Sequence, residues 1–188
     1  MSLLPPKQNV LQGDVKYCPS SDAVYNFVSG LTIGPAFPYY GSFYDTTTQT
    51  NSPNNTPRAM TFNSISGNYH VSIQNNSRIT FDYSGTYNIQ FSAQFDKSTG
   101  TPSIVNIWLR QNGVDIPWSD TEITLANSSK VVAAWNFVVT EVNTSYIELF
   151  WASSDSNVQI LSKPAQVSPY PAPGIPSIIL TVTPVKGL

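Results

Sequence analysis

Apolar and polar positions alternate along most of the chain from Tyr39 onward, and the segment YSGTYNIQFSAQFD (83–96) shows this pattern most clearly. The apolar positions of this segment are Tyr87, Ile89, Phe91, Ala93 and Phe95. The positions between them are Asn88, Gln90, Ser92 and Gln94. A period of two is typical of a strand that buries one face in a core. The other face carries amides and hydroxyls where a strand facing water usually has Lys or Glu, so it needs an explanation of its own.

The same alternation predicts about ten strands. They are expected near residues 39–45, 57–62, 68–74, 77–82, 86–96, 103–111, 114–125, 130–141, 145–152, 156–161 and 176–184. Asn112-Gly113 indicates a tight hairpin, because this pair readily adopts the positive φ angles of such a turn. Many short strands with frequent turn signals favour an all-β sandwich or jelly roll over residues 39–188. The proline-rich residues 162–176 are predicted to form an ordered surface loop.

The first 38 residues lack this alternation, and we expect them to form an extended N-terminal arm. One stretch of the arm, SSDAVYNFVSG, predicts a short helix near residues 20–29. Ser20 or Ser21 can cap the start of this helix, and Gly30 suits its end.

Three late segments are apolar on both faces of the expected strand. They are residues 131–139, 146–151 and 178–182. A strand of a sandwich has one inner face, so the apolar residues on its other face must be covered by a loop, by the arm or by another subunit. Several such strands in a chain of this size favour another subunit.

Composition supports one folded domain with a largely neutral surface. Charged residues make up 11% of the 188 residues, against about 25% in typical soluble proteins, while 40% are hydrophobic. The net charge of −2 and the scattered Lys and Arg residues give no electrostatic basis for binding nucleic acid. The single cysteine, Cys18, allows no internal disulfide. Because no apolar stretch resembles a signal peptide or a membrane span, we expect a protein made in the cytoplasm, with no membrane partner.

Catalytic chemistry finds little support in the sequence, so we expect no enzyme, no cofactor and no metal. His70, the only histidine, sits in ordinary strand alternation and is better explained as a surface or interface residue than as the base of a catalytic triad. Aspartates near Trp118 offer oxygens that a calcium ion would accept, but turns attract Asp in any case. Trp118, beside a turn, and Tyr170, in the proline-rich loop, are the candidate exposed ligand contacts.

Seven segments, taken in order, resemble a trimeric jelly-roll domain of tailed-phage virion proteins, which is similar to the heads of tumour necrosis factor and its complement-type relatives. They are GSFYDTTTQTN (41–51), PRAMTFN (57–63), SGTYNIQFSAQFDK (84–97), IWLRQNGVDIP (107–117), VVAAWNFV (131–138), YIELFWASSDSNVQIL (146–161) and PSIILTVTPV (176–185). The resemblance covers about 145 of the 188 residues. It implies that one sheet of each subunit packs around a threefold axis. The trimer-interface residues that it implies are Tyr40, Phe43, Asn88, Gln90, Ser92, Gln94, Ile178 and Leu180.

The resemblance further implies a structural protein of the virion. In the favoured interpretation, homotrimers decorate and cement the capsid, and the arm docks on the major capsid protein. The arm residues expected to dock are Leu3, Leu4, Val10, Leu11, Tyr17, Val24 and Phe27. The alternative is the receptor- or glycan-binding head of a tail fibre or another virion appendage.

Overall fold

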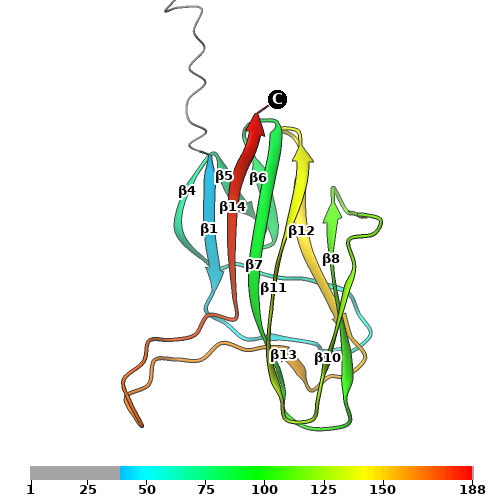
Figure 1. Cartoon of the computed structure of the whole chain (residues 1–188), viewed down its shortest axis with the longest axis vertical. Helices are drawn as coiled ribbons and strands as arrows, with labels where there is room; N and C mark the ends of the chain where they lie inside the picture. The colour runs from blue at the N-terminus through cyan, green and yellow to red at the C-terminus, as the bar shows by residue number, and fades with distance from the viewer. Residues whose placement is uncertain (1–38, 188) are drawn as a thin grey trace, which may run out of the picture. The chain divides into compact units, whose positions relative to one another are not determined.

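The computed structural model of the protein describes residues 39–187, so the predicted arm and its helix near 20–29 lie outside the described residues. The described part is all-β and forms two sheets in which every strand pair is antiparallel (Figure 1). No helix in this part is long and apolar enough to cross a membrane. The all-β prediction is therefore confirmed for residues 39–187.

Sheet A contains the strand on which the sequence pattern is clearest. Its five long members, in spatial order, are β4 (Ser64–Tyr69), β1 (Tyr40–Asp45), β14 (Ile178–Gly187), β7 (Gly85–Lys97) and β11 (Lys130–Glu141). Two short strands, β13 (Val158–Ile160) and β2 (Gln49–Thr50), extend the sheet beyond the start of β14. β7 is the central strand, because it pairs with β14 and β13 along one edge and with β11 along the other.

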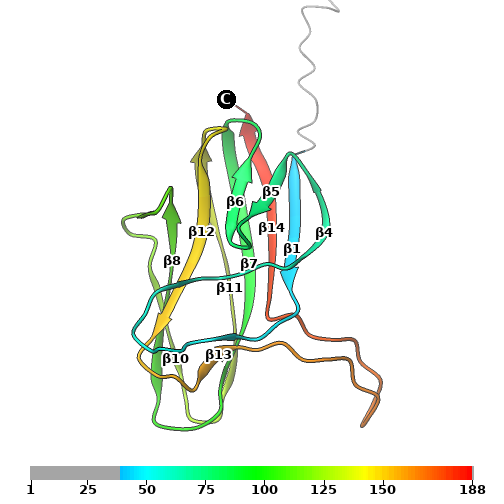
Figure 2. The same cartoon turned by 180° about the vertical axis from the view of Figure 1, so that it is seen from behind.

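Sheet B forms the second layer, which Figure 2 shows from its own side. Its members, in spatial order, are β5 (Val71–Gln74), β6 (Arg78–Phe81), β12 (Tyr146–Ser153), β8 (Ser103–Gln111) and β10 (Thr121–Leu125). Two short strands flank this path: β3 (Arg58–Ala59) pairs with β12, and β9 (Val114–Asp115) pairs with β8. Antiparallel strands arranged in two layers with these crossovers make a jelly-roll sandwich.

The core lies between the sheets and is built by the inward faces of both. On β7 the inward positions are the predicted ones, since Tyr87, Ile89, Phe91, Ala93 and Phe95 are all buried. Phe95 meets Trp151 of β12 edge-on, with ring centroids 5.5 Å apart. Burial raises the pKa of the Tyr87 phenol, whose hydroxyl donates to the carbonyl of Tyr83 at 2.7 Å. The Tyr87 hydroxyl is thus hydrogen-bonded as well as enclosed.

Three predicted interface residues belong to this core instead. Phe43 of β1 and Ile178 and Leu180 of β14 have no exposed surface. The correction follows from parity: successive residues of a strand point to opposite faces, so assigning the wrong half of β14 moves every side chain to the wrong side. On β14 the outward residues are Ile179, Thr181 and Thr183, which pair across the sheet with the outward residues of β7.

Strand boundaries differ from prediction where the chain turns between sheets. The strand expected at 68–74 is divided at His70, whose φ of 58° lets the chain leave β4 in sheet A and enter β5 in sheet B. The strand expected at 114–125 is divided by a turn at residues 116–119. β4 itself was missed, because SISGNY has no apolar alternation. The Asn112-Gly113 hairpin is confirmed, with φ angles of 49° and 84°.

The proline-rich segment forms an ordered, paired ribbon that projects from the sandwich in both views (Figures 1 and 2). Backbone hydrogen bonds join Lys163 to Ile175 and Gln166 to Ala172 in both directions, at 2.8–3.0 Å. At its base, the Ser162 hydroxyl donates to the carbonyl of Thr46, just after β1. The prediction of an ordered surface loop is therefore confirmed.

A buried ion pair ties the end of β7 to the turn before β13. The Lys97 ammonium is fully buried and donates to Asp155, which also accepts hydrogen bonds from the Ser103 hydroxyl and the Asn157 amide, both at 2.9 Å. These partners, the Lys97 ammonium first, lower the pKa of Asp155 to about 2. The pair holds two segments that are far apart in the sequence.

Leu180→Ala tests the core assignment of β14. We expect it to lower the free energy of unfolding by about 2–5 kcal/mol, because it removes a fully buried side chain and leaves a cavity. Urea denaturation followed by tryptophan fluorescence measures this change. Val167→Ala, in the exposed part of the proline-rich ribbon, is the matched control and should change stability little. A loss below about 1 kcal/mol for Leu180→Ala would contradict the assignment.

Asp155→Asn tests the ion pair through its pH dependence. At neutral pH the substitution leaves the Lys97 ammonium buried without a counter-charge, and we expect destabilisation of about 3 kcal/mol. The pKa of Asp155 is lower in the folded than in the unfolded state, so its contribution is complete above about pH 4 and lost as pH falls through about 2. Thermal unfolding of both proteins across this range should show that the difference in stability between them becomes smaller as the pH falls. A stability difference that does not change with pH would argue against the Lys97–Asp155 ion pair.

Candidate interaction surface

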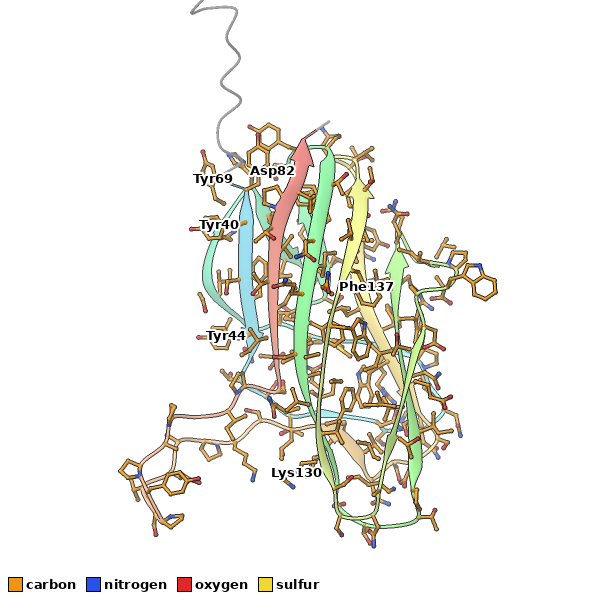
Figure 3. All side chains as sticks on the ribbon, viewed as in Figure 1. Tyr40, Tyr44, Tyr69, Asp82, Lys130 and Phe137 are labelled. Carbon is orange, nitrogen blue, oxygen red and sulfur yellow. The ribbon has the colours of Figure 1, made fainter. Side chains whose placement is uncertain are left out.

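The solvent side of sheet A presents a broad surface without charged side chains, which we call the uncharged face. Its members are Val132, Ala134, Asn136, Val138 and Thr140 on β11; Thr86, Asn88, Gln90, Ser92 and Gln94 on β7; Ile179, Thr181 and Thr183 on β14; Tyr40, Ser42 and Tyr44 on β1; and Gly67 and Tyr69 on β4. Figure 3 shows Tyr40 and Tyr44 along β1, with Tyr69 beside Tyr40. The face crosses five strands.

The register places the polar residues of this face in rows across the sheet. One row runs from Asn136 through Gln90 and Thr181 to Ser42. The Asn136 amide of this row donates to Oδ1 of Asn88, which lies in the next row, at 3.0 Å. Amides and hydroxyls both donate and accept, so side chains in these rows can bond to one another and still offer groups to a partner.

Apolar side chains interrupt these rows and are left open to solvent. Val132 and Val138 on β11 are 56% and 60% exposed, and Ile179 on β14 is 43% exposed. Tyr40 and Tyr69 add two half-exposed rings at the β1/β4 side. These apolar groups are exposed on a surface whose interior has no charged residue, which favours contact with a partner over contact with water alone.

Charged residues of the described strands lie at both ends of the face: Lys186 of β14 is paired with Thr86 at one end, and Lys130 and Asp96 lie at the other. Lys130, at the start of β11, forms an ion pair with Asp96 of β7, and Gln159 donates a hydrogen bond to the same carboxylate at 2.9 Å. Burial acts to raise the pKa of Asp96, but the hydrogen bonds from Lys130 and Gln159 outweigh it and leave the pKa lowered. The negative charge of Asp96 at this border is therefore balanced by Lys130 of the same chain.

The predicted interface residues divide cleanly between this face and the core. Tyr40, Asn88, Gln90, Ser92 and Gln94 lie on the uncharged face, where the sequence analysis put them. Phe43, Ile178 and Leu180 do not, as described above. The outward residues of β14 were missed, although the alternation of Leu180 and Val182 with Thr181 and Thr183 carried the signal.

The doubly apolar segments are covered in two different ways. On β12, the outward Phe150 is 8% exposed, because the Arg110 guanidinium lies 3.9 Å above its ring and Trp108 packs beside it. That cover comes from within the chain. Among residues 39–187, nothing covers the outward Val132 and Val138 of β11 and Ile179 of β14 in this way, so the expectation of a partner applies to sheet A.

The remaining candidate residues lie on separate elements. Trp118 is fully exposed in the turn between β9 and β10, and Tyr170 is 64% exposed in the proline-rich ribbon. His70 bonds to Asp82 at 3.0 Å and packs among tyrosine rings. Within residues 39–187, no three His, Cys, Asp or Glu side chains are grouped so that they would hold a metal ion.

The arm residues of the sequence analysis lie outside the described residues. They are Leu3, Leu4, Val10, Leu11, Tyr17, Val24 and Phe27, together with Cys18. Their role in docking therefore stays a prediction.

The chain is similar to known proteins in structure but not in sequence. No protein-family model and no curated protein matches the sequence. Among solved structures, the globular domain of zebrafish complement 1qA protein is similar to this chain at 12% sequence identity and a TM-score of 0.49. The match covers 80% of this chain and 98% of that domain.

Gln90→Lys tests whether the uncharged face is a contact between copies. Gln90 is exposed in the middle of the face, so the new ammonium would be buried without a partner in any assembly that covers it. We expect self-association to weaken at least about 100-fold, measured as the ratio of assembled to single chains by native mass spectrometry. Thr124→Lys places the same charge on β10 of sheet B and should assemble like the unaltered protein. Equal assembly of both variants would exclude this face.

Proposed function

We propose that the protein is a non-enzymatic structural protein that forms a homotrimer through the uncharged face of sheet A. The observation that carries the proposal is a five-strand surface with no charged side chain and with open Val132, Val138 and Ile179. When a partner covers this surface, each Å² of buried apolar area contributes about 25 cal/mol of favourable free energy. The threefold stoichiometry comes from the sequence resemblance to trimeric virion jelly rolls.

The chemistry of the face suits contact between identical copies. At a threefold axis, the side chains that reach the axis meet their own equivalents, so a charged residue there would be stacked against like charges. Asn88, Gln90 and Thr181 avoid this, because each can donate to one copy and accept from another, directly or through water. The uncharged outward half of β7 is explained in this way.

The biological role that we propose is decoration and cementing of a phage capsid, at the virion surface, with the major capsid protein as partner. The order of the seven sequence segments described above supports it. Trimers that bind only the assembled shell would stabilise that shell by mass action. Several arms on each trimer would add avidity beyond a single contact. The arm residues 1–38 are proposed to supply the docking contacts.

A second role, the binding head of a tail fibre or another appendage, is supported by one observation. Trp118 is fully exposed on sheet B, which leaves it accessible when sheet A is covered. A binding head needs exposed contacts of this kind away from its own assembly surface.

Removal of residues 1–38 tests the capsid role. We expect the shortened chain to form trimers as the full chain does, because the uncharged face is retained, but to lose binding to purified phage heads that lack the protein. Cryo-electron microscopy of the mixed samples measures occupancy of the lattice. Shells decorated by the shortened chain would contradict the role of the arm. Shells left bare by the full chain, with the protein found at the appendages of complete virions, would favour the second role.

A further inference from the structure

The outer side of sheet B carries a groove of about 500 Å³ that the proposed self-association does not use. Two tryptophans, two aspartates and an asparagine line it: Trp108, Trp118, Asp115, Asp120 and Asn106. They come from β8, from β9 and from the turn and loop that lead into β10. Its volume lies within the range of small-ligand sites, and its mixture of aromatic and polar groups is typical of them.

Trp118 is presented to solvent by a turn that is fixed in place. Its indole is fully exposed and its backbone φ is 65°, a conformation that a bulky residue rarely adopts. The turn is anchored to β8 on both sides of the indole. The Ile116 amide donates to the Leu109 carbonyl at 2.9 Å, and the buried Ser119 hydroxyl accepts from the Leu109 amide at 3.0 Å. A large exposed ring on a strained, anchored backbone points to a binding role.

Hydrogen bonds fix the two carboxylates of the groove in position, and each carboxylate keeps one oxygen available to accept a hydrogen bond from a ligand. Trp108 Nε1 and Arg110 Nε both donate to Asp115 Oδ1, at 2.7 and 2.8 Å. The Asn106 amide donates to Asp120 Oδ2 at 3.0 Å. Within residues 39–187, Asp115 Oδ2 and Asp120 Oδ1 accept no hydrogen bond. Hydrogen bonds from Arg110 and then Trp108 lower the pKa of Asp115, so this carboxylate stays ionised in mildly acidic solution.

We infer that this groove binds a neutral pyranose unit of a glycan. A pyranose has a C–H face that packs on an indole, whose ring face is electron-rich, and hydroxyls at its edge that donate to carboxylates. The groove offers a partner for each: the Trp118 indole for the C–H face and the Asp120 carboxylate for the hydroxyls. Within the described residues, Asp115 is the one of the two carboxylates that is paired with a cation, so the groove keeps negative charge and disfavours acidic sugars.

The groove stays accessible when copies of the protein associate through sheet A. It lies on sheet B, so covering sheet A leaves it open in every copy. Three open sites on one trimer would bind a multivalent glycan more tightly than a single site. The inference specifies the ligand of the second role proposed above, and the site itself does not require self-association.

The test uses the full chain and a panel of neutral methyl pyranosides with gluco, galacto, manno and N-acetylglucosamine configurations. Saturation-transfer NMR detects binding, and titration of tryptophan fluorescence gives the affinity. We expect at least one pyranoside to bind. Trp118→Ala and Asp120→Asn should each weaken it at least about tenfold, while Tyr170→Ala, which removes an exposed aromatic side chain from the ribbon, should leave it unchanged. Native mass spectrometry of each variant reports assembly separately, so failure of this inference is distinguishable from failure of the trimer.

Two outcomes would overturn the inference. The first is that no neutral pyranoside binds, or that one binds equally well to Trp118→Ala and Asp120→Asn. The second is that tetramethylammonium binds in place of sugars and is lost in the same variants, which would make the groove a site for an organic cation. Because Trp118 is fully exposed, its replacement should leave folding intact, and thermal unfolding of the variant checks this.

Discussion

The packing of β7 against sheet B is the constraint on which the rest of the structure depends. Phe91 and Phe95 of this strand lie in the core, where they meet Trp135 of β11 and Trp151 of β12. Because side chains alternate, burying this half of β7 fixes the other half outward. The paired strands β11 and β14 are then locked in register, and their outward residues join those of β7 in one surface. The uncharged face is thus a geometric consequence of how the core packs.

The two outer surfaces of the sandwich differ in chemistry, although both belong to one small domain. The middle of the solvent side of sheet A has no charged residue on its five long strands, and the charged residues Lys130, Asp96 and Lys186 lie at the strand ends. The solvent side of sheet B, by contrast, carries Arg110, Asp115 and Glu122 along with its exposed indole. A need for solubility alone would have charged both surfaces. The difference argues for two tasks, in which one surface is covered by other copies and the opposite one stays accessible.

Local sequence patterns were sufficient for most strands but not for every side-chain direction. Alternation identified β7, β8 and β11 almost to the residue, and Asn-Gly identified the hairpin after β8. It failed at β4, whose small and polar residues carry no period, and at His70, where a positive φ turns the chain between sheets. In β14 the run Ile178-Ile179-Leu180 is apolar on both faces, so the local sequence does not show which side chains point into the core. The pairing of β14 with β7 decides this, and that pairing cannot be read from a local pattern. The contacts within the groove on sheet B join segments that only the folded hairpin brings together. The sequence singled out Trp118 as an exposed ligand contact and the aspartates near it as possible calcium ligands, but it did not place Trp108 or Asn106 beside them.

An experimental structure of the protein in its assembled state would test the central claim most directly, because it shows which surface of the sandwich is covered. The account predicts that copies meet across sheet A around a threefold axis, with Gln90 and Thr181 buried and the groove beside Trp118 open. An assembly in which sheet A faces solvent, or a protein that remains a single chain at high concentration with that face bare, would contradict it.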